Sequence, residues 1–201
     1  MIILGLGGLL GDAASVLLKD GKPQAAAEET KIARTVRPGS IPEASINECL
    51  RMAHVRKEQV NVVAVARPFT RGPESHLHLT LRNEFPNAEI AVFEHQRAHA
   101  ASAYFASPFD EATVLTLDNA GDFRCGGLWA GTGGQLRLDR EWYYPDSLGR
   151  LYGAVTALLG GHIDVVAASP TNVFAQLQTG RESGMQSFDQ ALLDLYRRGL
   201  I

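Results

Sequence analysis

The sequence predicts an α/β fold built from two related lobes, each of which opens with a three-stranded meander. Two stretches carry this prediction, because residues 1–30 and residues 112–143 both read as strand, turn, strand, turn and strand. Between them, apolar strand-like runs alternate with segments of helical spacing, which is typical of a sheet with crossover helices. Residue identity between the two stretches is low, so the repeat is one of architecture and not a solenoid period.

The opening residues form the first predicted meander. The run MIILGL is an apolar strand, GGLLGD is a glycine-rich turn, and the next two strands meet at Asp20-Gly21, a strong signal for a two-residue hairpin. The N-terminal run has no basic segment, and Asp12 interrupts it well short of the ~20 apolar residues that a membrane span needs. We therefore expect a buried strand there and no secretion signal.

The middle of the chain predicts alternating helices and strands. PEASINECLRMAHV places Ile46, Leu50 and Ala53 on one helical stripe, and QVNVVAVA is a strand. PESHLHLTLRNEF is expected to be a helix, AEIAVFE a strand, and RAHAASAYFA a short buried helix. The second meander follows, starting at ATVLTLD and turning back at a Gly-Gly pair.

A last helix is predicted in PDSLGRLYGAVTALLG. Its apolar residues recur at helical spacing, at Leu148, Leu151, Tyr152, Val155 and Leu158. Only about forty residues follow this helix, which is too few for a complete second lobe. We expect a first lobe, the truncated start of a second lobe, and a divergent tail, over residues 1–108, 109–159 and 160–201.

This order of elements is the layout of the actin/sugar-kinase/Hsp70-like (ribonuclease H-like) fold. In that fold, two related halves face each other across a nucleotide cleft, and the hairpin turns approach phosphate groups. A generic α/β sheet with an added meander is the alternative interpretation.

Composition narrows the class of protein. A hydrophobic content of 45% with 20% charged residues is ordinary for a globular domain with a core. The net charge of −3 and the lack of a basic run argue against nucleic-acid binding. Cys49 and Cys125 lie far apart and form no CxxC motif, so we expect free thiols, a reducing compartment and a cytoplasmic protein without a membrane partner.

Two histidines four residues apart suggest a metal site. His95 and His99 share one helical face, so both can point at one ion. Asp118 closes the apolar strand VLTLD, and ligands bind at the carboxyl ends of strands in open α/β sheets. Two histidines and a carboxylate suit Fe(II), Mn(II) or Zn(II) with positions left for substrate. In the structural alternative, His95 caps the helix and His99 is a hydrogen-bonded core residue.

Other polar residues are candidates for substrate contacts. The loop GLGGLLGDAAS offers backbone amides near a strand end, as phosphate-binding loops do. Asp12 in this loop can orient a substrate hydroxyl or a hydrated cation, or simply cap the turn. Lys31 and Arg34 can meet a phosphate or carbamoyl group, or can lie on a solvated charged edge.

Several blocks resemble the NodU/CmcH family of O-carbamoyltransferases. The stretch HQRAHAASAYFASPFDEATVLTLDNAGDF, followed by YYPDSLGRLYGAVTALLG, carries HxxxHAASA and SLGxLY blocks at that family's spacing. The similarity covers roughly residues 2–159. It implies an actin-like metal-binding domain, which this family shares with the tRNA threonylcarbamoyl transferases and, more remotely, with the hydrogenase-maturation carbamoyltransferases.

The resemblance implies roles for individual residues. The family's iron-type ligands fall on His95, His99 and Asp118, so Fe(II) is the expected metal. Asp12 matches the aspartate of the family's N-terminal HDA-type motif, near the carbamoyl and nucleotide site, and is the expected catalytic residue. The residues expected to bind substrate or nucleotide are Asp12, Lys31, Arg34 and Asp122.

The resemblance also implies a reaction. Carbamoyl phosphate and ATP are joined as carbamoyl adenylate in a separate C-terminal domain, and the metal domain presents this anhydride to a small-molecule hydroxyl acceptor. A bound cation would act as a Lewis acid on the carbonyl and steady the leaving AMP. The chain by itself is expected not to form the adenylate.

Three departures from the family pattern support an alternative. Gly11 stands where many members have a histidine, and the glycine-rich block, a fourth metal ligand and the adenylating domain are missing. The chain could therefore be a degenerate, non-catalytic remnant that binds nucleotide or a partner. A third interpretation is a small-ligand receptor, because GGHIDVVAASPTNVFAQLQTGR is reminiscent of periplasmic tricarboxylate-binding receptors.

Overall fold

A computed structural model describes residues 1–11, 13–33, 39–67, 74–121 and 124–158 of the chain. The strands are β1 (Ile2–Gly7), β2 (Ala14–Lys19), β3 (Lys22–Glu28), β4 (Val62–Ala66), β5 (Glu89–Phe93), β6 (Glu111–Gly121), β7 (Arg124–Thr132) and β8 (Gln135–Tyr143). The helices are α1 (Glu29–Ile32), α2 (Glu43–Met52), α3 (Glu74–Glu84), α4 (His95–Phe105) and α5 (Leu148–Leu158), with a 3-10 turn, η1 (Lys57–Gln59).

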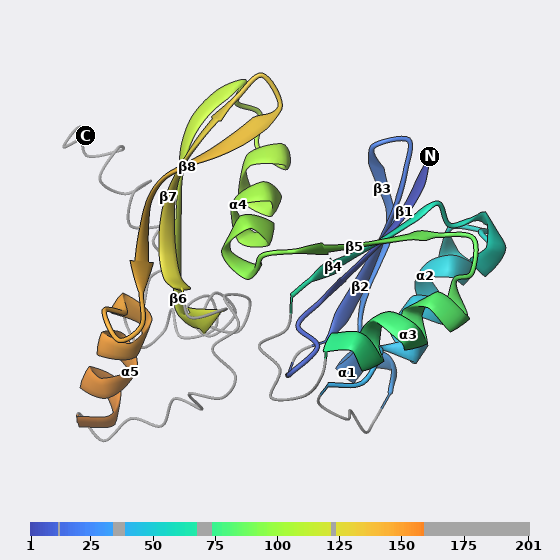
Figure 1. The fold of residues 1–201 in the computed structure, drawn as a ribbon, viewed down its shortest axis with the longest axis horizontal. Coiled ribbons are helices and arrows are strands. Elements are labelled where there is room, and N and C mark those ends of the chain that lie inside the picture. Colours follow the sequence, from blue (N-terminus) through green and yellow to red (C-terminus); the bar gives the residue numbers. More distant parts are fainter. Residues whose placement is uncertain (12, 34–38, 68–73, 122–123, 159–201) are drawn as a thin grey trace, which may run out of the picture.

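The first lobe is a five-stranded sheet in the order β3-β2-β1-β4-β5 (Figure 1). The first three strands form an antiparallel meander, β4 runs parallel to β1, and β5 runs parallel to β4. This is the strand arrangement of a ribonuclease H-like lobe, so the predicted fold class is confirmed. The predicted hairpin is also present, because Asp20 and Gly21 both have positive φ, of 52° and 77°.

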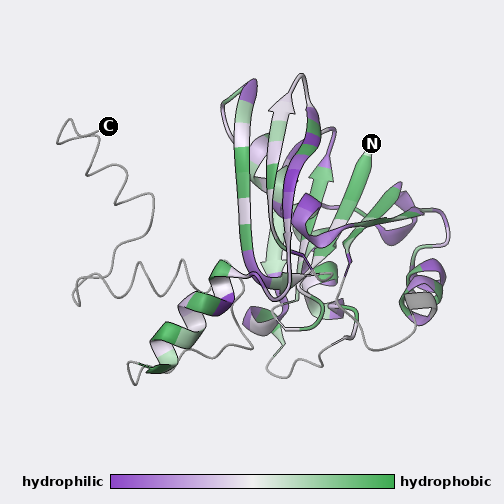
Figure 2. Cartoon of the chain, turned by 60° about the vertical axis from the view of Figure 1, so that its left-hand side comes forward, coloured by the Kyte–Doolittle hydropathy of each residue, from purple (hydrophilic) through white to green (hydrophobic). Residues whose placement is uncertain are grey.

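One face of this sheet carries the main core. Alternate residues of β1, β2 and β4 are buried, among them Leu4, Leu17 and Val63. Helix α2 contacts β2 and β3 and buries the predicted stripe of Ile46 and Leu50 against them. Figure 2 shows the apolar strands of this lobe in green beside helices of mixed hydropathy.

The short helix α1 lies within the segment expected to be a charged edge. Lys31 is exposed there, as that interpretation predicts, but Glu29 is buried. The Glu29 carboxylate accepts hydrogen bonds from the backbone amides of Ala44 and Ser45, at 3.2 and 2.7 Å. It therefore satisfies the free amides at the start of α2, whose own N-cap, Pro42, offers no side-chain acceptor.

The second sheet is the antiparallel meander β6-β7-β8, so the predicted strand order of residues 112–143 is confirmed. Helix α4 lies between the two sheets and packs on β6 and β7 (Figure 1). Ala100 and Tyr104 of α4 meet Val114 and Trp129 in a small core. Only this face of α4 is buried, so the helix is less enclosed than predicted, and the lobe boundary near residue 108 stays a prediction.

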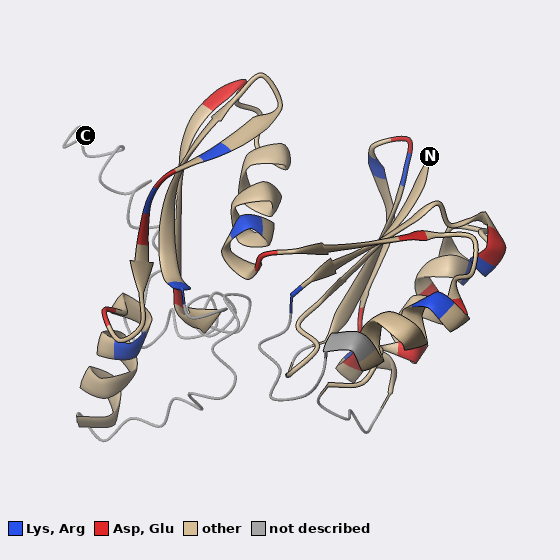
Figure 3. Ribbon diagram, viewed as in Figure 1, with Lys and Arg blue, Asp and Glu red and all other residues tan. Residues whose placement is uncertain are grey.

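Helix α5 forms where the apolar spacing predicts it. Its apolar residues are all exposed, however, from Val155 at 49% to Leu158 at 88%. Figure 3 shows little charge on this helix, whereas α2 and α3 carry charged side chains. Among the described residues, no helix is both long and apolar enough to cross a membrane.

Candidate metal centre

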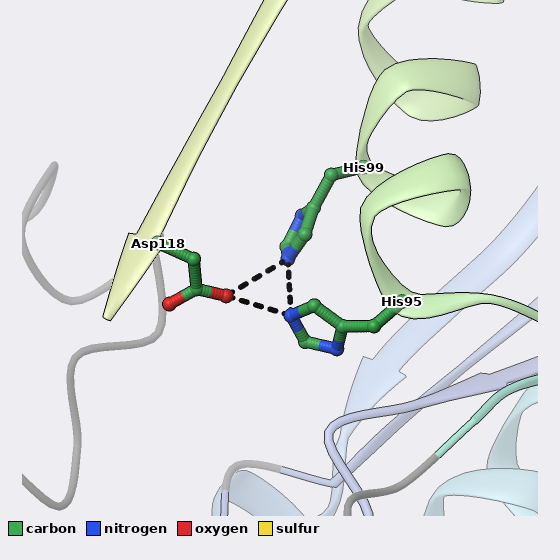
Figure 4. A group of neighbouring side chains, drawn as sticks. All are labelled: His95, His99 and Asp118. Carbon is green, nitrogen blue, oxygen red and sulfur yellow. Dashed lines mark hydrogen bonds and ion pairs between the residues drawn. The ribbon is translucent and has the colours of Figure 1, made fainter. Parts of the chain in front are cut away.

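The start of helix α4 positions both histidines. Glu94 precedes the helix in an extended conformation, and its carboxylate accepts hydrogen bonds from the amides of Gln96 and Arg97, at 3.1 and 3.0 Å. This N-cap fixes the first turn of the helix, which begins at His95. His99 follows one turn later, so both rings project from one side of α4 (Figure 4).

Asp118 comes from an irregular part of β6. The sequence predicted that the strand ends at this residue, but β6 continues to Gly121, and that detail of the prediction was wrong. The ladder with β7 is interrupted between Leu117 and Gly121. Asp118 therefore lies at a break in the pairing, where the chain bends and the carboxylate can turn toward α4.

The three side chains meet as predicted. The Nε2 atom of His95 lies 2.7 Å from Oδ2 of Asp118 and 2.9 Å from Nε2 of His99, and His99 Nε2 lies 3.6 Å from the same oxygen (Figure 4). At metal–ligand distances of about 2.1 Å, neighbouring ligand atoms are about 3.0 Å apart in octahedral geometry and about 3.4 Å apart in tetrahedral geometry. The observed spacings of 2.7, 2.9 and 3.6 Å are close to these values, so the donor set fits a divalent cation bound by all three atoms.

Two-centre hydrogen bonds do not account for all three sides of this triangle. A neutral imidazole nitrogen either carries a proton or accepts one. His95 Nε2 therefore cannot donate to Asp118 and accept from His99 at the same time, although both atoms lie within hydrogen-bond distance. A cation would satisfy all three lone pairs together, which is the chemistry of a site with two histidines and one carboxylate.

The local electrostatics keep Asp118 ionised. Burial by itself would raise the pKa of this carboxyl, which is 9% exposed. The neighbouring imidazoles of His95 and His99 and the amide of Asn119 outweigh the burial and hold the pKa of Asp118 below its usual value. A carboxylate that stays charged is the form that binds a cation.

An ion-pair network fastens α4 to the second sheet. Arg124, the first residue of β7, lies 3.1 Å from the carboxylate of Glu94 and 2.7 Å from that of Glu141 on β8. Because Glu94 also caps α4, this network holds the helix end that carries His95. The sequence did not reveal it, since the three charges lie far apart in the chain and follow no pattern.

The SLGxLY block lies against Asp118. Ser147 donates a hydrogen bond to the Asp118 carbonyl, at 2.8 Å, and Gly149 packs on the peptide that follows Asp118. Gly121, at the other end of the β6 irregularity, lies directly under the ring of His95. The sequence showed these residues as a recognisable block and a turn glycine, without indicating what they contact.

The remaining predicted site residues stay predictions. Lys31 is exposed on α1, in the first lobe, and α1 contacts α2. Asp12, Arg34 and Asp122 lie outside the described residues. No contact between these residues and a substrate or nucleotide is therefore established.

A cavity of about 1130 Å³ lies between the first sheet and α4. Small residues form most of its walls, including Gly5, Ala64 and Ala101, and its charged lining residues are Glu28 and Arg97. Its volume is sufficient for a small ligand. The cavity lining does not include the two histidines or Asp118, but it does include Arg97 and Ala98, which lie between the histidines on α4.

A family comparison agrees with the resemblance seen in the sequence. The model of the carbamoyltransferase N-terminus matches residues 75–199, which is more than half of the chain. The matched region includes both histidines and Asp118. The chain therefore belongs to the carbamoyltransferase N-terminus family.

Individual relatives are longer than this chain. It is 33% identical over 195 residues to an uncharacterized protein of Synechocystis, sll1178, covering 79% of this chain and 32% of that protein. It is 29% identical over 172 residues to the nodulation protein NolNO of Sinorhizobium fredii, covering 74% of this chain and 25% of that protein. The chain thus spans about a third and a quarter of their lengths. YeaZ from Pseudomonas aeruginosa, a solved structure, is 15% identical with a TM-score of 0.48, covering 72% of this chain and 66% of that one.

Proposed function

We propose that this chain is the metal-binding N-terminal part of an O-carbamoyltransferase. Family membership supports carbamoyl transfer as the reaction class. The observation that carries the proposal is the convergence of His95, His99 and Asp118, whose ligand atoms all lie within 4.8 Å of one another. Fe(II) is the proposed metal, since two imidazoles and one carboxylate form the facial set of non-haem iron sites.

The proposed transfer has one bond made and one bond broken. The acceptor hydroxyl oxygen attacks the carbamoyl carbon of carbamoyl adenylate, the bond from that carbon to the phosphate oxygen breaks, AMP leaves, and the hydroxyl proton is released to solvent. A cation in the site supplies Lewis-acid stabilisation of the charge that develops on the carbonyl and phosphate oxygens. His95, His99 and Asp118 would hold the cation on one side and leave its other positions for these oxygens.

The same proposal places adenylate formation outside this chain. A site that joins ATP to carbamoyl phosphate must bind several phosphate groups, which requires several cationic side chains. Among the described residues, the cavity wall has one cationic side chain, that of Arg97. The relatives' greater length leaves room for a separate adenylating domain. We also propose a cytoplasmic location, because Cys49 and Cys125 are both free and buried.

The first test is metal binding. The chain is purified without oxygen, loaded with Fe(II), desalted and analysed for iron. We expect about one iron per chain in the wild type, and loss of most of it in His95→Ala and His99→Ala, because each removes a ligand. His76→Ala is the matched control, since His76 is exposed on α3, a different helix that contacts β5 of the first sheet. Equal iron in all four proteins would refute the metal site.

The second test is transfer. AMP release from ATP and carbamoyl phosphate is measured with this chain, with a separately expressed adenylating domain, and with both. We expect AMP release to depend on both proteins and on Fe(II). If the chain binds iron but the two proteins together release no AMP, the result would favour the alternative that the chain is a non-catalytic remnant of the family. Robust turnover by this chain alone would show that adenylate formation does not need the second domain.

A further inference from the structure

We infer that the turn from Ser147 to Gly149 positions the Asp118 carboxylate, and that this is the role of the SLGxLY block. The inference rests on the proposed metal site and goes beyond it, because it assigns a function to residues that bind no metal themselves. It follows from two contacts between the start of α5 and the irregular part of β6, and from a third that joins the turn before α5 to β7.

The first contact is a hydrogen bond to the Asp118 backbone. Ser147 Oγ donates to the Asp118 carbonyl at 2.8 Å, and the same oxygen accepts the amide of Arg150 at 3.0 Å. The hydroxyl therefore caps α5 and forms a hydrogen bond to the Asp118 backbone at the same time. Ser147 is 7% exposed, so little water can substitute for its hydroxyl.

The second contact is a close approach of two backbones. A Cβ atom at Gly149 would lie 2.8 Å from the carbonyl of Asp118 and 2.8 Å from the amide of Asn119. Real Cβ atoms do not come this close to backbone, and backbone cannot move aside as a flexible side chain can. Only glycine therefore lets the first turn of α5 rest directly on the peptide that follows Asp118.

These contacts matter because the regular pairing of β6 with β7 is interrupted in this part of β6. The ladder is interrupted between Leu117 and Gly121, so Asp118 lacks the regular pairing that fixes the rest of the strand. At the far end of the interruption, a Cβ at Gly121 would lie 2.1 Å from His95 Cδ2. The irregular segment thus contains Asp118 and lies against the ring of His95. The start of α5 contacts this segment and supports it.

A third contact anchors the turn itself. Cys125 on β7 lies with its thiol 3.1 Å from the Asp146 carbonyl, directly before Ser147. This contact connects the turn to the second sheet. The start of α5 can therefore support Asp118 although the apolar face of the helix is exposed. Residues that orient metal ligands in this way typically contribute about 10- to 100-fold to metal affinity.

The experiment separates this role from helix capping. Mn(II) affinity is measured by calorimetry on the full chain for the wild type, Ser147→Gly, Ser147→Thr and Gly149→Ala. Glycine at an N-cap costs a helix little, but it removes the donor to Asp118. We expect Ser147→Gly and Gly149→Ala to bind Mn(II) about 10-fold or more weakly. Threonine should restore affinity close to the wild type, because it keeps the hydroxyl.

Thr156→Ala is the matched control, since its hydroxyl also bonds a backbone carbonyl on α5, that of Tyr152, but lies away from Asp118. It should bind Mn(II) as the wild type does. Wild-type affinity in Ser147→Gly and Gly149→Ala would overturn the inference and leave the proposed metal site intact. A wild type that binds no Mn(II) or Fe(II) would overturn both, whereas metal binding without carbamoyl transfer would affect only the proposed function.

Discussion

The two lobes of this chain are stabilised in different ways. The first buries a continuous apolar core between its sheet and helices α2 and α3. The second buries only a small cluster between α4 and its meander, and the apolar face of α5 is exposed. Two of the candidate metal ligands lie on α4, which packs on the second sheet, and the third lies on β6 of that sheet. We infer that burial of apolar surface stabilises the first lobe, whereas ion pairs, hydrogen bonds and a bound metal contribute more to the second.

The largest expected effect is in the first core. Phe85 is 1% exposed there, and Phe85→Ala should lower the free energy of unfolding by about 3–5 kcal/mol, because it removes a buried ring and leaves a cavity. Phe105→Ala is the matched control, since Phe105 is 61% exposed, and should cost about 0.5 kcal/mol or less. Urea denaturation measures both. Equal losses would contradict the contrast between a buried and an exposed phenylalanine.

The next effect tests whether metal stabilises mainly the second lobe. A cation present at about 100 times its dissociation constant should stabilise the folded site by about 2.7 kcal/mol. Hydrogen exchange is measured with and without Mn(II). The metal should slow the exchange of backbone amides in α4 and β6 and leave the exchange rates in β1 and β4 nearly unchanged. Asp118→Ala should abolish the difference. Equal protection of both sheets would mean that the two lobes respond to the metal as one unit.

A smaller effect tests the minor core. The Tyr104 hydroxyl donates to the Asp110 carbonyl at 2.8 Å and ties the end of α4 to the loop before β6. Tyr104→Phe keeps the ring and removes this bond, so it should lower the free energy of unfolding by about 1 kcal/mol. Thermal melts measure the change. Iron content should stay at the wild-type level, and a large loss of iron would show that this end of α4 also positions the histidines.

The smallest effect compares the two thiols. Burial raises the pKa of both Cys49, in the first core, and Cys125, on β7, so neither is a ready thiolate near neutral pH. We expect Cys125 to react a few times faster than Cys49 with a thiol reagent, because the smaller core opens more readily. Cys49→Ser and Cys125→Ser assign the two rates. If Cys49 reacted faster than Cys125, the first core would open more readily than the smaller one, which would contradict the expected order.

The sequence alone was enough for most of the strands and helices and for the three candidate ligands. Strand and helix patterns with periods of two and about 3.6 residues depend on local side-chain spacing, so the meanders and the α2 stripe could be predicted. The spacing of His95 and His99 likewise defines a shared helical face. Asp118 was predicted as the third candidate ligand because it was expected to close an apolar strand, and ligands bind at such strand ends in open α/β sheets.

Only the tertiary structure decided how these parts are supported. The buried Glu29 that caps α2, the Arg124 pairs that hold α4, and the Ser147 contact with Asp118 each join residues that are distant in the chain. The break in β6 at Asp118 also depends on how β7 pairs with it. Such contacts follow no sequence period, because they arise when separate elements pack together. The sequence therefore determined which residues are available for a candidate metal site, and packing determined how they are held.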